Sequence, residues 1–180
     1  GDVIWIHDGF ICEPDGPSDY VSGGGGTRTH FDVSKAVTFR SVAGDARNHP
    51  NPPCFRGRWH DPDAVPVVKQ GNNAIRALGV SEAAQFIGLV FENSSARDNA
   101  SYPGGCIACN DGKRVRFDKC IVRNNVSTRG AIKSSAAVIT DCVFSNNTGT
   151  DVGNGASVYN CHFENNTGGA VAHFSNFTGP

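Results

Sequence analysis

Three near-copies of one phrase occupy residues 117–166: Asp118-Lys-Cys-Ile-Val-Arg-Asn-Asn125, Thr140-Asp-Cys-Val-Phe-Ser-Asn-Asn147 and Tyr159-Asn-Cys-His-Phe-Glu-Asn-Asn166. Each copy places an apolar residue two positions after its cysteine and then an Asn-Asn pair. The three cysteines lie 22 and 19 residues apart. A repeat of about 20 residues that combines alternating apolar positions with a polar turn is typical of a solenoid in which one repeat forms one coil.

The repeat extends towards the N-terminus when the coils are aligned on the cysteine positions. Four columns of like residues then recur together: Leu89, Cys120, Cys142 and Cys161; Phe91, Val122, Phe144 and Phe163; Phe86, Phe117, Ile139 and Val158; and Asn93, Asn124, Asn146 and Asn165. The beginnings of the coils match as well, at Ala74-Ile75, Cys106-Ile107, Ala131-Ile132 and Ala170-Val171. We therefore expect short strands that pair in register between successive coils, with like side chains stacked about 4.8 Å apart.

The asparagine column has a structural interpretation. Asn at a bend can hydrogen-bond the backbone groups that a turn leaves unpaired, and stacked amides can bond to one another. We therefore predict an inner amide ladder made of Asn93, Asn124, Asn146 and Asn165.

The composition predicts an all-β protein. The chain has 180 residues with 22 Gly, 9 Pro and no Met, which favours many turns between short strands. We expect one domain over residues 1–180, with irregular early coils and long loops in 1–72 and regular coils in 73–180. The formal net charge is -1 and there is no basic run, so nucleic acid is not an expected partner. No apolar run is long enough to span a membrane.

The Gly-Gly-x-Ile coil starts and the Asp-Cys-x-Phe-Ser-Asn-Asn phrase resemble the right-handed parallel β-helix family, particularly pectin-lyase-like and polymorphic-outer-membrane-repeat proteins. The resemblance covers residues 73–178 well and 2–42 loosely. It implies an all-β, single-stranded right-handed parallel β-helix with long N-terminal loop excursions. It leaves the activity open, because this fold hosts lyases, hydrolases, epimerases, adhesins and structural proteins.

Family members that cleave polysaccharides carry acidic residues and an Arg or Lys on an outer strand row, often with calcium. The matching row of this chain contains Arg76, Ala108, Lys133 and Ala172 and no carboxylate. Arg76 and Lys133 are therefore candidates for carbohydrate binding, roughly 10 Å apart on strand spacing. We predict no catalytic residue, no metal and no cofactor, and we interpret Lys119 and Asp141 as an exposed ion pair.

Seven cysteines and six Asn-x-Ser/Thr triplets favour an extracellular or cell-surface location. Cys12, Cys54, Cys106 and Cys109 are candidates for disulfides, with Cys12–Cys54 as the first pairing, whereas the column of Cys120, Cys142 and Cys161 is interpreted as buried thiols. The glycosylation candidates are Asn99, Asn125 and Asn176, which lie outside the predicted ladder. Asn93 ranks after them, because an asparagine in the ladder could not carry a glycan.

The sequence of the last coil, from Val171 to Pro180, contains no amphipathic segment that would cap a solenoid. We expect the chain to be either a piece of a longer protein or one subunit of an assembly. The preferred hypothesis is a non-enzymatic structural or adhesion module that associates with itself, or with another extracellular protein, into a surface filament or matrix. The alternative is a carbohydrate-active β-helix: a lyase, hydrolase or binding module for acidic polysaccharide.

Overall fold

The computed structural model describes residues 1–12, 29–57, 75–80, 82–96, 107–109, 112–127, 130–149, 152 and 155–168. Residues 29–32, 75–80, 95–96, 108 and 127 are described by their backbone alone. Within these ranges the regular secondary structure consists of short strands and one 3-10 helix, η2 (Ala46–Asn48). The all-β prediction is confirmed.

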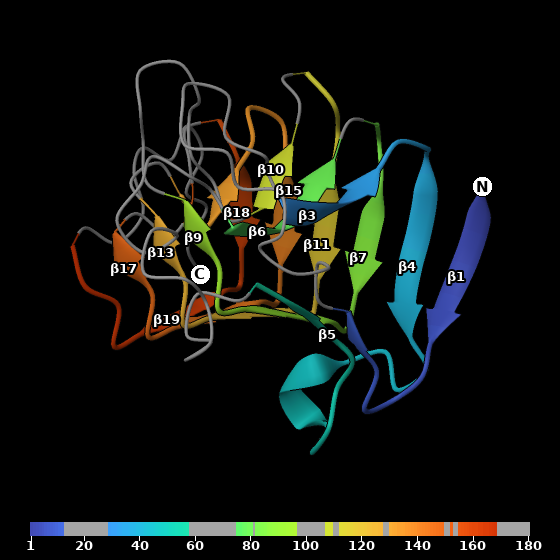
Figure 1. Cartoon of the computed structure of the whole chain (residues 1–180), viewed down its shortest axis with the longest axis horizontal. Coiled ribbons are helices and arrows are strands. Elements are labelled where there is room, and N and C mark those ends of the chain that lie inside the picture. Colours follow the sequence, from blue (N-terminus) through green and yellow to red (C-terminus); the bar gives the residue numbers. More distant parts are fainter. Residues whose placement is uncertain are drawn as a thin grey trace.

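The strands form three sheets, and each coil adds one parallel strand to the first sheet and one to the second (Figure 1). The first sheet contains β1 (Asp2–Ile6), β4 (Val37–Ser41), β7 (Gln85–Ile87), β11 (Arg116–Asp118), β15 (Val138–Thr140) and β18 (Ser157–Tyr159). The second contains β2 (Ile11–Cys12), β5 (Cys54–Arg56), β8 (Val90–Glu92), β12 (Ile121–Arg123), β16 (Val143–Ser145) and β19 (His162–Glu164). Figure 1 shows the first sheet crossing the molecule in chain order, from β1 to β18.

The third sheet closes the coils and is less regular. Its strands are β3 (Thr29–Val33), β6 (Ile75–Val80), β10 (Ile107–Cys109), β14 (Ile132–Lys133), and the two-residue strands β9 (Ser95–Ala96), β13 (Val126–Ser127) and β17 (Thr148–Gly149). The strands β14, β10, β6 and β3 form one part of this sheet, and β9, β13 and β17 form the other. The two parts meet at one antiparallel pair, Ile75 of β6 with Ser95 of β9. Each coil therefore passes through the first sheet, then the second, and returns through the third.

The register confirms the apolar columns and carries them further towards the N-terminus. In the first sheet, Phe86 pairs with Phe117 and also with Phe39, and the column continues to Ile4, Ile139 and Val158. In the second sheet, the column runs through Cys12, Phe55, Phe91, Val122, Phe144 and Phe163. Alternation along each short strand directs these columns inward, and all their members except the exposed Ile4 pack into one continuous core.

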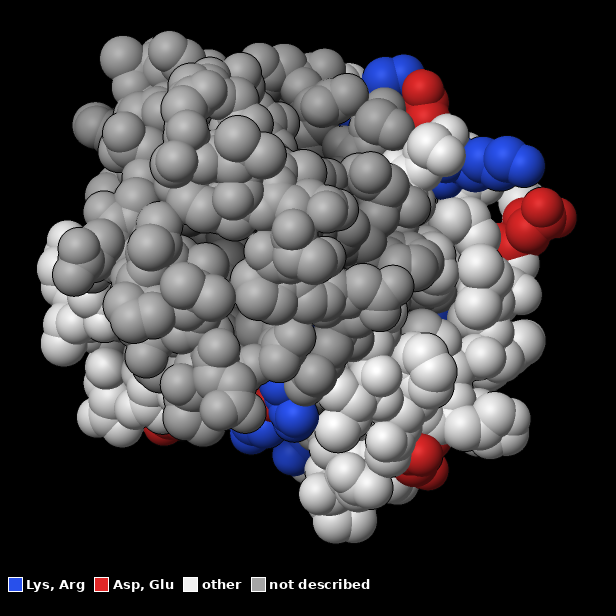
Figure 2. Space-filling model, viewed as in Figure 1, with Lys and Arg blue, Asp and Glu red and all other residues white. Residues whose placement is uncertain are grey.

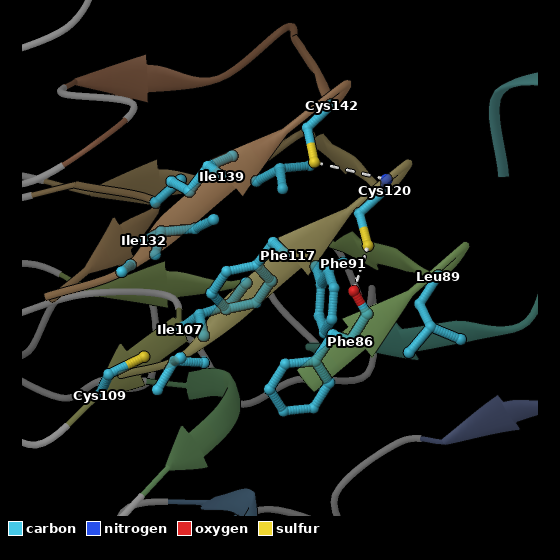
Figure 3. Close-up of a cluster of buried hydrophobic side chains, with 14 of the residues drawn as sticks. Phe86, Leu89, Phe91, Ile107, Cys109, Phe117, Cys120, Ile132, Ile139 and Cys142 are labelled. Carbon is cyan, nitrogen blue, oxygen red and sulfur yellow. Dashed lines mark hydrogen bonds between the residues drawn. The ribbon is translucent and has the colours of Figure 1, made fainter. Parts of the chain in front are cut away.

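Aromatic rings in the core follow the same repeat. Phe86 stacks on Phe117 with ring centroids 5.2 Å apart, and Phe91 meets Phe86 edge to face at 5.7 Å. Figure 3 shows these rings beside the sulfur atoms of Cys120 and Cys142, which lie above one another at the corner between the first two sheets. Both ring geometries are favourable for aromatic pairs. The stacked pair joins neighbouring coils, and the edge-to-face pair joins the first two sheets within one coil.

One predicted alignment is wrong. Ile107 pairs with Leu78 and not with Ile75, and Ala108 pairs with Gly79. The strand β6 is six residues long and pairs with β3 through an irregular register. A two-residue sequence match cannot detect a strand that begins three residues earlier than its neighbour. Similarly, Ile132 is followed in its column by Val152, which the sequence alignment passed over.

Two corners of each coil are made by residues with left-handed backbone conformation. Between the first and second sheets these are Lys119, Asp141 and Asn160, with φ of 50 to 54°. After the second sheet they are Asn93, Asn124, Asn146 and Asn165, with φ of 52 to 56°. Asn and Asp tolerate this region better than most residues because their short side chains hydrogen-bond locally. The sharp bends explain why polar residues recur directly after each strand.

Candidate functional site

An asparagine ladder runs beside the second sheet. It consists of Asn125 and Asn147, which are buried, and Asn166, which is half-buried. The Oδ1 atom of each accepts a hydrogen bond from a backbone N–H of the preceding coil, at 2.8 to 3.0 Å, from Ser94, Asn125 and Asn147 in turn. The Nδ2 atom of each donates to a backbone carbonyl, at 3.0 to 3.2 Å, of Phe91, Val122 and Phe144. The ladder therefore satisfies two backbone groups per rung that the turn would leave unpaired.

The predicted ladder of Asn93, Asn124, Asn146 and Asn165 is wrong by one position. These first members of the pairs adopt the left-handed conformation, and Asn146 and Asn165 are exposed while Asn93 and Asn124 are half-buried. The left-handed residue makes the bend and directs its own side chain outward, so the next residue turns inward. Sequence columns could not separate the two, because both members of each pair are asparagine in the last three coils.

A buried carboxylate lies on the outer side of the second sheet. The side chain of Glu92 is 5% exposed and sits between two guanidinium groups. Arg56 Nε donates to Glu92 Oε1 at 2.7 Å, and Arg123 Nε donates to Glu92 Oε2 at 2.7 Å. Burial raises the pKa of Glu92, but the hydrogen bonds from Arg123 and Arg56 outweigh it and leave the pKa below its usual value of 4.5. Glu92 is therefore ionised at neutral pH and fully engaged.

Glu92 and Arg123 directly follow Phe91 and Val122 of one apolar column, so the aligned sequence already places them side by side, but that column did not extend to Arg56. Pairing of Phe55 with Phe91 brings Arg56 directly beside Glu92. The signal that could have identified Arg56 is its position directly after Phe55, which matches the position of Glu92 directly after Phe91. Because both carboxylate oxygens accept charge-assisted bonds, Glu92 is suited to holding three strands together and not to transferring a proton.

The two carbohydrate-binding candidates do not share a row. Lys133 pairs with Ala108, which pairs with Gly79, so Arg76 lies three residues away from the position that the alignment gave it. Lys133 is half-buried, and Arg76 is described by its backbone alone. The row that we predicted for an acidic polysaccharide is therefore not assembled by the register.

The acids at the first corner have local partners. Asp141 Oδ1 accepts a hydrogen bond from the Asn160 amide in the next coil. Asp118 Oδ2 lies 3.9 Å from Arg116 Nη2, on the same strand. Lys119 shares the corner column with Asp141, but the predicted ion pair between these two described residues is not formed, because the Asp141 carboxylate binds Asn160. These contacts order the corner. On the described part of the face in Figure 2, cationic and anionic side chains are interspersed.

The predicted Cys12–Cys54 disulfide is not formed. In the register of β2 with β5, Cys12 pairs with Phe55 and Ile11 pairs with Cys54. The two thiols therefore point to opposite faces of the sheet: Cys12 packs against the core, and Cys54 lies in an outer cluster with Ala46 and Val90. Cys109 is a buried thiol whose pKa is raised by burial to about 12, and Cys106 lies outside the described residues.

The cysteine column is confirmed as a stack of thiols. Backbone N–H groups of Cys120 and Cys142 donate to the sulfur of the next coil, Cys142 Sγ at 3.4 Å and Cys161 Sγ at 3.3 Å. Figure 3 shows the first of these bonds. Hydrogen bonding to the Cys120 thiol and burial raise the pKa of Cys142, so it stays protonated at neutral pH. These thiols act as small core groups.

The structure separates the sequons by exposure. Asn125 is 1% exposed and holds the ladder, so its prediction as a glycosylation site is wrong for the folded chain. Asn93 is half-buried, and Asn99 and Asn176 lie outside the described residues.

Exposed large apolar residues gather on the first coil and its neighbour. They are Val3, Ile4, Trp5, Phe10, Ile11 and Val42; Tyr159, in the last described coil, is also exposed. Trp5 is 56% exposed and lies 5.3 Å from the Arg40 guanidinium. We call the set from Val3 to Val42 the apolar edge.

Within the described residues, no group of three His, Cys, Asp or Glu side chains could hold a metal ion. No helix among them is long and apolar enough to cross a membrane.

A family model described as "right handed beta helix region" matches residues 68–178, which is more than half of the chain. The chain belongs to the right-handed β-helix family. The match agrees with the parallel sheets and repeating columns of the structure. The description of the family names a fold and does not name an activity. No match was found among curated proteins or among solved structures. This β-helix must therefore be interpreted from its own surfaces.

Proposed function

We propose that this β-helix is a non-enzymatic extracellular structural or adhesion module that associates through its apolar edge. The observation that carries the proposal is the concentration of exposed large apolar side chains on the first coil. Single exposed apolar residues are common on soluble proteins, whereas a gathered set marks a surface that binds a partner.

The geometry of β1 supports an edge that receives another strand. Ile4 belongs to the inward column of the first sheet, yet it is 45% exposed because no described coil stacks on it. Among the described strands, β1 pairs with β4 alone, and β2 pairs with β5 alone. Both edges belong to the same coil. A strand edge of this kind is a template for pairing with another chain.

We take the partner to be a parallel coil from a second copy of this chain. Coils of this β-helix already fit one another, since each stacks its inward residue on an equivalent residue in the next coil. A second copy would continue the column of Phe39 and Ile4 and cover Trp5 and Phe10 on either side. Such a head-to-tail contact does not close on itself, so it favours filaments.

The charged groups of the described surface are consistent with a scaffold. Glu92 binds two arginines that belong to neighbouring coils, and Asp141 binds Asn160 of the next coil. Each of these contacts links strands of the sheet.

The test measures association of the purified chain by light scattering and electron microscopy over a range of concentrations. We expect concentration-dependent oligomers or fibres, and we expect I4K to reduce association strongly. T140K, on the outer side of the same sheet but away from the edge, is the matched control and should associate normally. A chain that stays monomeric and releases unsaturated or reducing ends from uronate polymers would refute the proposal and favour the carbohydrate-active alternative.

A further inference from the structure

We infer that Asn146 and Asn165 are N-glycan acceptors of this chain, and that Asn125 is excluded. The inference rests on the extracellular location in the proposed function. Both asparagines begin Asn-x-Thr triplets, Asn146-Asn147-Thr148 and Asn165-Asn166-Thr167, and neither has proline at the middle position. A sequon must also place its asparagine at a surface where a bulky sugar fits.

The corner geometry places both side chains outward. Asn146 and Asn165 have φ of 54° and 52°, directly after β16 and β19, and both are exposed. The backbone N–H of Asn146 donates to Glu164 O at 3.2 Å, which ties this corner to the next coil. Neither side-chain amide hydrogen-bonds another described residue. Attaching a sugar to Nδ2 would therefore break no contact of the described fold.

Asn125 offers the opposite environment. Its side chain is 1% exposed, accepts the Ser94 N–H at 3.0 Å and donates to Phe91 O at 3.2 Å. A glycan on Nδ2 would remove that donor and would have to be buried beside the core. A chain modified at Asn125 cannot form this turn, so it should be absent from the folded protein.

The co-reactant is an oligosaccharide carried on a lipid pyrophosphate. The asparagine Nδ2 attacks the anomeric carbon of the first sugar, and a C–N bond forms. The C–O bond to pyrophosphate breaks, and the lipid pyrophosphate leaves with the bonding electrons while Nδ2 loses one proton. Thr148 and Thr167 supply the sequon hydroxyls; both are exposed, with their Oγ1 atoms 3.4 Å apart.

The two acceptors lie on adjacent coils at the far end of the described chain from the apolar edge. Ser145 pairs with Glu164, so the asparagines that follow are one strand spacing apart, about 4.8 Å. Glycans there would cover one corner of the last coils and leave β1 and β2 accessible.

The experiment secretes the chain, behind a cleavable leader, from a eukaryotic cell line and isolates the folded fraction. Enzymatic release of N-glycans in heavy-oxygen water converts each occupied Asn to a labelled Asp, which peptide mass spectrometry locates. We expect label at positions 146 and 165 and none at 125. The double variant T148A/T167A should lose both glycans, whereas T148S/T167S should keep them; N146Q/N165Q provides a second test that leaves the threonines intact.

Two results would overturn the inference: folded, secreted chain with both acceptors unmodified, or folded chain labelled at Asn125. In this experiment the added leader directs the chain into the secretory pathway, whatever the natural location of the protein. A failure of the proposed function, shown by monomeric behaviour or an intracellular natural protein, is therefore distinguishable from a failure of the acceptor assignment.

Discussion

Replacing Asn147 with alanine discriminates between the two asparagines of the repeated pair. Asn147 is 1% exposed, and its side chain hydrogen-bonds two backbone groups of the preceding coil. Its Oδ1 accepts the N–H of Asn125 at 3.0 Å, and its Nδ2 donates to Val122 O at 3.0 Å. The substitution N147A removes both partners at once. The neighbouring residue Asn146 is exposed, so the substitution N146G provides a matched control one position away.

The expected loss follows from the groups left without partners. A buried polar group without a hydrogen bond costs about 1–3 kcal/mol, so two backbone groups give about 2–6 kcal/mol. The side-chain amide of Asn125 also loses its bond to Asn147 Oδ1, at 3.1 Å. Glycine at position 146 adopts φ of 54° without a Cβ penalty, so we expect N146G to change stability by less than about 1 kcal/mol.

The free energy of unfolding is measured by urea titration with circular dichroism. We expect N147A to lower the midpoint markedly at a similar m-value, and N146G to leave the midpoint nearly unchanged. If N146G destabilises as much as N147A, or if N147A costs less than about 1 kcal/mol, the ladder does not satisfy buried backbone groups as argued.

Three further predictions concern the sheet, a corner and the core. Because the folded pKa of Glu92 is lowered, its stabilising contribution is present above pH 4.5 and is lost as the pH falls through the folded pKa. Both arginine partners are partly exposed, so E92Q should be less stable at pH 7 by about 1.5–3 kcal/mol and should show a flatter acid-denaturation profile. An unchanged profile would contradict this. Gly88 has φ of +69°, and an added Cβ would lie 2.6 Å from the backbone of Gly44. G88A should therefore destabilise the chain more than G112A, since a Cβ at position 112 meets nothing within 4 Å. Equal shifts of the melting temperature would count against the packed corner. The fully buried Phe144 stacks on Phe163 at 4.9 Å, so F144D should abolish the folded state, and retained strand content in circular dichroism would show that the register is wrong.

The repeat made the strands, the apolar columns and the thiol stack predictable. Phe117, Cys120 and Val122 are separated by fixed intervals, so one alignment placed all three correctly. The candidate sites were less predictable because they depend on offsets of one to three residues. Asn146 and Asn147 are identical in sequence, and the left-handed bend alone decides which of them faces the core. Lys133 and Arg76 were separated by the length of β6, which the dipeptide Ala74-Ile75 does not report.

The sequence by itself determined that this chain winds into parallel coils, because a period of about 20 residues with alternating apolar positions can bury its apolar side chains only by stacking repeat upon repeat. The tertiary structure decided what each polar residue does. The pairing of β5 with β8 brought Arg56 to Glu92, 36 residues apart in the chain, and the register of β2 with β5 turned Cys12 and Cys54 to opposite faces. Those outcomes depend on how strands separated by long loops align, and loop length carries no information about register.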